Sequence, residues 1–178
     1  KLTATGTKDA TTFLRGDNSF SALPASGITQ ADMWRTNSNV FKSSSGDITG
    51  NWEQVDSDSP GFIGSAMTQS SGIFTFPSTG IYLILAIMYI YPDGNRVFSG
   101  HQIKVTTDNS TYSDATDSVQ HTTAGLNYIN TNSSFILDVT DTSNVKVKLT
   151  YVSSGSATVL GTTNSTYTGM TFIRLGDT

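Results

Sequence analysis

The sequence predicts an all-β protein, a sandwich or barrel of eight to ten antiparallel strands. Short runs of β-branched and aromatic residues recur along the chain, and Gly, Pro, Asn and Asp separate them at roughly even spacing. No stretch shows the 3.6-residue apolar repeat of an amphipathic helix. A length of 178 residues fits one domain that buries a hydrophobic core.

Composition supports this class and narrows the possible partners. Only 13% of the residues are charged, whereas Ser and Thr number 24 and 28, which suits a β-protein with polar loops. A net charge of −4 gives no support for nucleic-acid binding, and no basic amphipathic segment suits a membrane surface. Because cysteine is absent, disulfides and thiolate metal sites are excluded, and folding in a reducing cytoplasm is expected.

The central element is the apolar run at residues 81–91, bounded by Gly80 and Pro92. With 11 residues it is about half as long as a membrane-spanning helix, so we expect a strand. Successive side chains of a strand point to opposite faces, and both faces are apolar here. One face carries Ile81, Leu83, Leu85, Ile87 and Tyr89, and the other carries Tyr82, Ile84, Ala86, Met88 and Ile90.

Such a strand needs cover on both faces. The sandwich core covers one, and no amphipathic helix is present to cover the other. We therefore expect a second copy of the chain to cover it, and long loops of the same chain are the alternative.

The other strands are expected on either side of this one. Phe74 and Phe76 share one face of a short strand, and residues 145–152 alternate cleanly, with Val145 inward and Lys146 outward. Polar loops are expected at residues 107–117 and 153–165. The expected strands span residues 31–41, 51–55, 62–67, 72–76, 81–91, 96–106, 118–122, 126–139, 145–152 and 166–175.

The N-terminal residues 1–25 are small and polar, and we expect an extended linker or stalk remnant that leads into the domain at residues 26–178. The chain begins without Met and without a signal-peptide pattern, so it looks like part of a longer protein. Arg15-Gly16-Asp17 could be interpreted as an integrin ligand, but Gly-Asp-Asn is ordinary turn chemistry, which we favour.

Three segments, in order, resemble the tumour-necrosis-factor-like superfamily, especially its complement globular-head branch. Residues 72–84, with Gly80-Ile81-Tyr82, are similar to the segment that leads into that family's central strand. Residues 135–139 with 144–149 look like its sixth and seventh strands, and residues 165–172 resemble its closing strand. The resemblance covers roughly residues 34–175.

This resemblance implies a ten-stranded antiparallel jelly roll that assembles as a homotrimer. Carried over to this chain, it places Tyr82, Ile84 and Met88 in the core. It implies that the trimer interface contains Ile81, Leu83, Leu85, Ile87 and Tyr167.

The N-terminal segment suggests a setting for the domain. Residues 9–20, Asp-Ala-Thr-Thr-Phe-Leu-Arg-Gly-Asp-Asn-Ser-Phe, look like a segment seen repeatedly in tail-fibre and other virion proteins of marine bacteriophages, including those of cyanobacteria. This resemblance implies a phage appendage rather than a cytokine, located in the virion and assembled in the host cytoplasm.

Catalytic and metal-binding patterns are missing from the sequence. His101 and His121 lie outside any Gly-x-Ser-x-Gly context, and we expect surface or interface histidines. Glu53 is the only Glu, so a paired-carboxylate glycosidase site is not expected, and neither is enzyme activity. No cofactor is expected, although the Asp residues at 56–58 and 114–117 could contribute to calcium sites. Sequons at Asn109, Asn132 and Asn164 fit coincidence in a Ser/Thr-rich chain.

The resulting hypothesis is a non-enzymatic trimeric knob of a phage fibre that recognises the bacterial surface, with a glycan as the expected receptor. Loops at the end opposite the termini are expected to carry recognition, at residues 92–96, 122–125 and 153–165; no aromatic platform is evident beside them. The alternatives are a purely structural trimerisation or capsid-decoration module, and a bacterial adhesin or carbohydrate-binding module. The candidate ligand-binding residues are Asp93, Asn95, Arg96, Thr123 and Asn164.

Overall fold

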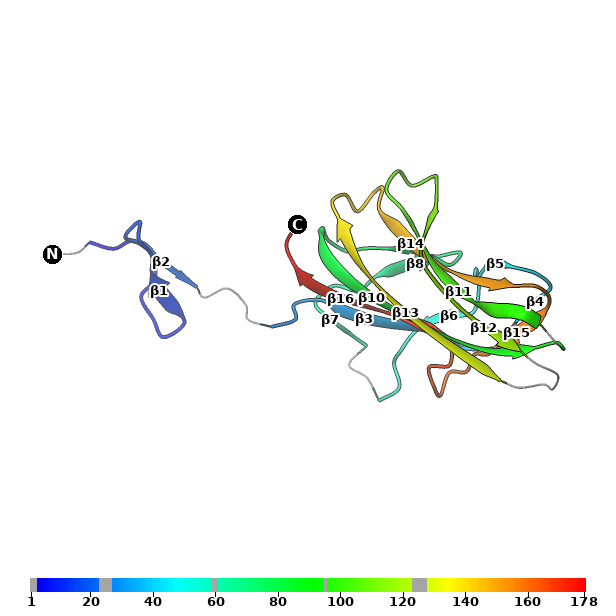
Figure 1. The fold of residues 1–178 in the computed structure, drawn as a ribbon. Coiled ribbons are helices and arrows are strands. Elements are labelled where there is room, and N and C mark those ends of the chain that lie inside the picture. Colours follow the sequence, from blue (N-terminus) through cyan, green and yellow to red (C-terminus); the bar gives the residue numbers. More distant parts are fainter. Residues whose placement is uncertain (1–2, 23–26, 59–60, 95, 123–127) are drawn as a thin grey trace.

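The computed structural model describes residues 3–22, 27–58, 61–94, 96–122 and 128–178, and every regular element in these ranges is a β-strand. Figure 1 shows two layers of strands packed face to face, with a small hairpin apart from them near the N-terminus. Within these ranges, no helix is long and apolar enough to cross a membrane. The prediction of an all-β sandwich is confirmed.

β10 (Gly80–Pro92) is the centre of the first layer, which we name the inner sheet. One edge of β10 pairs with β13 (Ile129–Val139). The other edge pairs first with β16 (Gly169–Gly176) and then with β15 (Ala157–Val159). The sheet continues from β16 to β3 (Ala31–Thr36), and its remaining strands are β4 (Val40–Lys42), β6 (Trp52–Gln54) and β7 (Phe62–Ile63).

The second layer, which we name the outer sheet, has the order β12-β11-β14-β9-β8, and β5 also pairs with β14. β11 pairs with β12 and β8 with β9, which are consecutive in the sequence, whereas β14 joins β11 to the distant β9 because the chain crosses between the two layers. Together the two sheets form an antiparallel jelly roll. The strands are β5 (Gly46–Asp47), β8 (Thr68–Ser70), β9 (Ile73–Thr75), β11 (Arg96–Thr106), β12 (Ser113–Thr122) and β14 (Lys146–Ser153).

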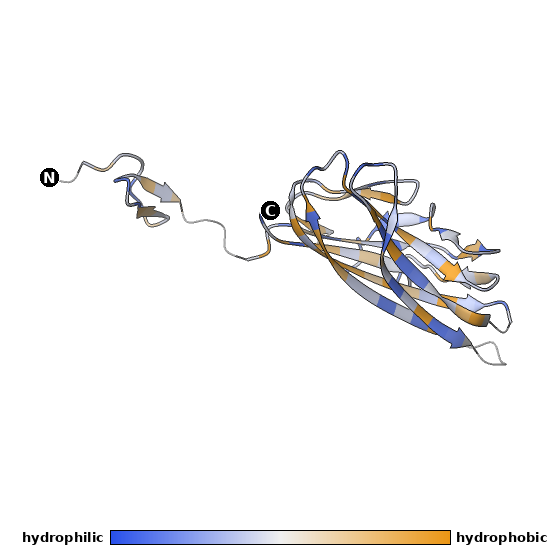
Figure 2. Cartoon of the chain, turned by 45° about the horizontal axis from the view of Figure 1, so that its top comes forward, coloured by the Kyte–Doolittle hydropathy of each residue, from blue (hydrophilic) through white to orange (hydrophobic). Residues whose placement is uncertain are grey.

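The core lies between the sheets and is built by alternation along the strands, which Figure 2 displays as orange bands separated by white and blue ones. The inward side chains of β10 are at most 4% exposed, as expected. Phe74 packs against Trp34, Trp52 and Phe172 at ring-centroid distances of 5.0–5.7 Å. Burial of each such large side chain contributes about 1.5–3 kcal/mol, so this cluster is a major source of stability.

The alternation predicted for β14 is confirmed on its inward side and wrong on its outward side. Val145, Val147, Leu149 and Tyr151 are all fully buried. On the other side, Lys146 is only 8% exposed and Thr150 only 5%. β5 causes the second result, because Asp47 pairs with Thr150 in the register and accepts its hydroxyl hydrogen bond at 2.7 Å.

Three further expectations need correction. The strand expected at residues 31–41 is interrupted at 37–39, so it becomes β3 and β4. The loop expected at 107–117 is shorter, because β12 begins at Ser113. The loop expected at 153–165 contains β15, in which Ala157 and Val159 are fully buried. Small residues pack here against β10 although the surrounding sequence is polar.

The N-terminal segment forms a hairpin of β1 (Thr12–Leu14) and β2 (Phe20–Ala22), so it is not extended throughout. The turn contains the Arg-Gly-Asp triplet, in which Asp17 Oδ1 accepts hydrogen bonds from Ser19 N and Ser19 Oγ at 3.0 and 2.6 Å. This local bonding matches the expected turn chemistry. Figure 1 places the C-terminus at the end of the sandwich that faces this hairpin, and the turn between β10 and β11 at the opposite end.

Candidate functional site

The outward face of the inner sheet carries an apolar row along β10. Ile81, Leu83 and Ile87 are half-buried there, and Leu85 is 40% exposed. These are four of the five residues expected at the trimer interface. Among the residues that the structure describes, no further strand layer covers this row, and Leu85 remains open to solvent.

The neighbouring strands extend this apolar face. Leu83 lies opposite Ile136 of β13 and Ile173 of β16 in the register, and Ile136 is 60% exposed. At the edge of the same sheet Phe62 and Ile63 of β7 are 43% and 44% exposed. Contiguous exposed apolar surface of this kind marks an interaction site in a soluble protein.

A hollow of about 390 Å³ interrupts the face beside Leu85. Gly169 lines it, opposite Ile87 in the register. A Cβ atom at Gly169 would come within 2.4 Å of the backbone oxygen of Trp34, so glycine is required there. The hollow has the size to accept an apolar side chain from another molecule. Its other lining residues are Ala86, Asn132, Ser133, Ser134, Thr166 and Thr171.

Four tyrosines form a row at the far end of this face. The Tyr89 ring stacks between Tyr128 and Tyr167, with centroid distances of 5.7 and 5.6 Å, and Tyr91 lies 5.0 Å from Tyr128. Tyr167, the fifth residue expected at the interface, is 43% exposed. Three of the four, Tyr89, Tyr128 and Tyr167, line a hollow of about 440 Å³ together with Asn39 and Leu160.

Sequence reasoning missed this aromatic surface. Tyr89 and Tyr91 are two residues apart on one strand, so their shared face could have been noticed. Tyr128 and Tyr167 come from distant segments, and only the pairing of β10 with β13 and β16 brings them to Tyr89.

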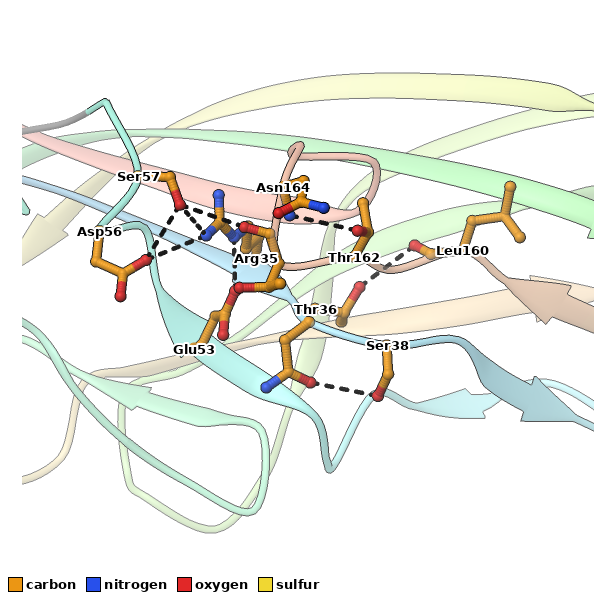
Figure 3. A network of polar contacts seen from close by, with 11 residues as sticks. Arg35, Thr36, Ser38, Glu53, Asp56, Ser57, Leu160, Thr162 and Asn164 are labelled. Atoms are coloured by element: carbon orange, nitrogen blue, oxygen red, sulfur yellow. Dashed lines mark hydrogen bonds and ion pairs between the residues drawn. The ribbon is translucent and has the colours of Figure 1, made fainter.

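A buried arginine lies on β3, which is separated from β10 by β16, and it pairs with Gly169 in the register. Arg35 is 2% exposed, and its Nε donates to Glu53 Oε1 at 2.7 Å. Its Nη2 donates to Asp56 Oδ1 and Ser57 Oγ, both at 3.2 Å. Figure 3 shows these side chains converging on the guanidinium. The network attaches the segment after β6 to β3, and it too was not predicted from the sequence.

This network lowers the pKa of Glu53. Burial alone would raise the pKa of Glu53, but hydrogen bonds from Arg35, Thr163 and Asn37 and the charge of Arg35 outweigh it, so its pKa lies below the usual value. Glu53 therefore stays ionised at neutral pH, so its contact with Arg35 is an ion pair.

The structure brings together only some of the candidate ligand-binding residues. Asp93 is held at the distal turn, where its backbone N–H donates to Ser156 O and its carboxylate accepts from Ser156 Oγ, both at 3.1 Å. Asn164 lies beside Arg35 and Ser57 in Figure 3, so it is not grouped with Asp93. The other candidates are Asn95 and Thr123, which lie outside the described residues, and Arg96, which begins β11 and whose side chain is not described.

The expectation for His101 is wrong. Its side chain is fully buried between the sheets, and its ring nitrogens lie 2.6 Å from Thr131 Oγ1 and 2.8 Å from Ser133 Oγ. Burial lowers the pKa of His101 to about 4, so it is neutral at pH 7. His121 is exposed, as expected.

The two regions weighed for calcium contain carboxylates with basic partners. Asp56 pairs with Arg35, and Asp114 Oδ1 lies 2.9 Å from Lys104 Nζ. Among the residues that the structure describes, no three His, Asp or Glu side chains are grouped so that they could hold a metal ion.

Comparisons with known proteins agree with the fold. No protein-family model matches the chain, and no curated protein matches it in sequence. Among solved structures, Eiger TNF from S. frugiperda is similar with a TM-score of 0.67 and 15% identity, over 83% of this chain and 93% of that chain. Murine APRIL is similar with a TM-score of 0.61 and 12% identity, over 82% and 98%. The globular domain of the zebrafish complement 1qA protein is similar with a TM-score of 0.51 and 11% identity, over 83% and 98%. The chain therefore has a TNF-like jelly-roll fold.

Proposed function

We propose that three copies of this chain assemble through the outward face of the inner sheet into a non-enzymatic knob at the distal end of a bacteriophage fibre or related virion protein. The knob recognises the bacterial host surface. One observation carries the assembly: the apolar row of β10, with Leu85 40% exposed, continues onto Ile136 and has no cover within the described chain. Burial of apolar area stabilises an assembly by about 25 cal/mol per Å² before the cost of association.

The TNF-like fold supports a trimer rather than a dimer. The resemblance noted in the sequence implies threefold assembly through this same face. A threefold axis beside β10 also brings three tyrosine rows together, and stacked aromatic pairs add about 0.5–1.5 kcal/mol each beyond their buried area. The hollow at Gly169 offers each neighbour a place for an apolar side chain.

The phage setting rests on residues 9–20, whose sequence resembles a segment of marine phage virion proteins. These residues form much of the N-terminal hairpin, at the end where the C-terminus also lies (Figure 1). If the rest of a fibre joins there, the turn between β10 and β11 faces the host. Three copies of a weak loop contact would then act together and increase the apparent affinity.

Host binding by three proteins tests this function: the wild type, Asp17→Ala, and a variant with Asp93, Asn95 and Arg96 all changed to Ala. We expect the triple variant to lose binding to host cells and Asp17→Ala to keep it. Loss only in Asp17→Ala would show that recognition lies in the hairpin. Light scattering on each protein checks that the trimer persists.

A wild-type trimer that binds no bacterial cell would support the structural alternative instead, a trimerisation or capsid-decoration module. Binding to cells by a protein encoded outside any phage genome would support the bacterial adhesin alternative. A surface of the outer sheet indicates which chemistry the receptor has.

A further inference from the structure

A further concave surface lies on the outward face of the outer sheet, on the opposite side of the sandwich from the tyrosine row. It is a hollow of about 470 Å³, within the size range of small-molecule sites. Its lining residues are separate from the apolar face of the inner sheet and from the distal turn. We name it the Phe98 groove, and it is lined by Ser45, Phe98, Gln102, Asp117, Val119 and Val152.

The strand pairing creates the groove. Phe98, Gly100 and Gln102 are alternate residues of β11, and Gly100 pairs with Val119 of β12 and with Val152 of β14. A Cβ atom at Gly100 would lie 1.9 Å from Ser118 O, so only glycine permits β12 to approach this closely. The walls are apolar but open, since Phe98 is 39% exposed and Val119 is 45% exposed.

The polar groups of the groove have unused acceptor capacity. Gln102 Nε2 donates to Asp114 Oδ2 at 3.0 Å and to Asp117 Oδ2 at 3.5 Å. This leaves the Gln102 amide oxygen and Asp117 Oδ1 without a hydrogen-bond donor among the described residues. Lys104 neutralises Asp114 at 2.9 Å, whereas Asp117 has no basic partner within ion-pair distance in that part of the chain. A ligand here must supply hydrogen-bond donors.

Hydrogen bonds connect the backbone segments around the groove. Phe98 O accepts hydrogen bonds from Ser154 N at 3.1 Å and from Ser153 Oγ at 3.0 Å. Ser45 Oγ accepts from Ser153 N at 2.9 Å and donates to Ser153 O at 3.2 Å. These bonds fix the backbone of Phe98 and the position of Ser45 on two sides of the groove.

We propose that the Phe98 groove binds a neutral pyranose residue of a surface glycan. A pyranose has an apolar face of C–H groups that can stack on Phe98, and its hydroxyls can donate to Gln102 and Asp117. Acidic sugars are disfavoured, because Asp117 and the net charge of −4 repel them. The proposal deepens, and rests on, the proposed recognition of a host glycan, and it adds a site on β11 that begins two residues after Arg96.

An array of immobilised neutral and sialylated oligosaccharides tests the proposal with the full chain. We expect the wild type to bind some neutral sugars and none that is sialylated. Phe98→Ala should weaken this binding at least 10-fold, Asp117→Asn about 3- to 10-fold, and Phe98→Tyr little. Phe13→Ala is the matched control, because Phe13 is a 42% exposed aromatic of the N-terminal hairpin, outside the groove, and should leave binding unchanged.

Melting curves and light scattering confirm that each variant is folded and assembled. Equal weakening by Phe98→Ala and Phe13→Ala, or capture of cationic ligands alone, would overturn the proposal. Host-cell binding that survives Phe98→Ala but is lost in the distal triple variant would overturn the groove and leave the proposed function standing. Sugar binding through Phe98 by a protein that binds no host cell would support the groove and contradict the proposed function.

Discussion

His101 Nε2 lies 2.8 Å from Ser133 Oγ, and this contact joins β11 of the outer sheet to β13 of the inner sheet. The surrounding hydrogen bonds assign its direction. Thr116 Oγ1 donates to Ser133 Oγ at 3.0 Å, so Ser133 has its own proton available for His101. On the other side Thr131 Oγ1 donates to Met88 O at 3.4 Å and therefore accepts from His101 Nδ1. The histidine is neutral, with its proton on Nδ1.

This arrangement predicts a loss of stability in mild acid. The neighbours of His101 are polar or aromatic and none is a carboxylate: the hydroxyls of Thr131, Ser133 and Thr116, and its register partners Ser118 of β12 and Tyr151 of β14. The pKa of His101 is about 4 in the folded chain against 6.5 when unfolded, so the unfolded state binds more protons between these values. The contribution of neutral His101 to the free energy of unfolding is fully present above pH 6.5. It falls by up to about 3 kcal/mol as the pH drops to about 4.

Urea unfolding at pH 7.5, 6.0 and 5.0 measures this effect. In a His101→Gln variant, which keeps a side chain able to donate and accept, the part of the pH dependence due to His101 should disappear. Identical pH profiles for the variant and the wild type would contradict the assignment.

Leu85→Asp should dissociate the proposed trimer. Three copies would bring three carboxylates together on a dry interface, where unpaired charges are strongly unfavourable. Light scattering at micromolar concentration should give the mass of three chains for the wild type and of one for the variant. Val97→Asp is the matched control. Val97 is 73% exposed on the other sheet, so this variant should still have the mass of three chains. A wild type with the mass of one chain would refute the assembly.

Tyr82→Ala should destabilise each chain by about 3–5 kcal/mol, as for other large core residues. Tyr82 is 2% exposed, its ring lies 4.7 Å from Phe76, and its hydroxyl donates to Gln30 Oε1 at 2.7 Å. Tyr82→Phe keeps the ring and should cost only about 1–2 kcal/mol for the lost hydrogen bond. Chemical unfolding measures both, and equal costs would show that the ring packing contributes little.

Arg35 should couple strongly to Glu53 and weakly to Asp56. The Glu53 side chain is 23% exposed and that of Asp56 is 81% exposed, so water screens the second pair far more. Double-mutant cycles with Arg35→Met, Glu53→Gln and Asp56→Asn should give a coupling above about 1 kcal/mol for the first pair and about 0–1 kcal/mol for the second. A larger coupling to Asp56 would contradict this order.

The sequence by itself determined the fold class and the most apolar strand. The period of two in residues 81–91 and 145–151 is a local property, because each side chain's direction follows from its neighbours along the strand. It separated Tyr82, Ile84 and Met88 from Leu83 and Leu85, and the resemblance to a TNF-like fold then placed the first set in the core, with which the burial of these residues agrees. The order of the elements was enough to identify the resemblance to a TNF-like jelly roll.

Tertiary structure decided what depends on pairing between distant strands. Tyr128 and Tyr167 reach Tyr89 only through the registers of β13 and β16, and no local pattern encodes a register between segments so far apart. His101 is polar in sequence, yet its position on the inward face of β11, opposite two hydroxyls, buries it. The Phe98 groove likewise exists because β12 approaches Gly100, a contact that no propensity of either strand predicts.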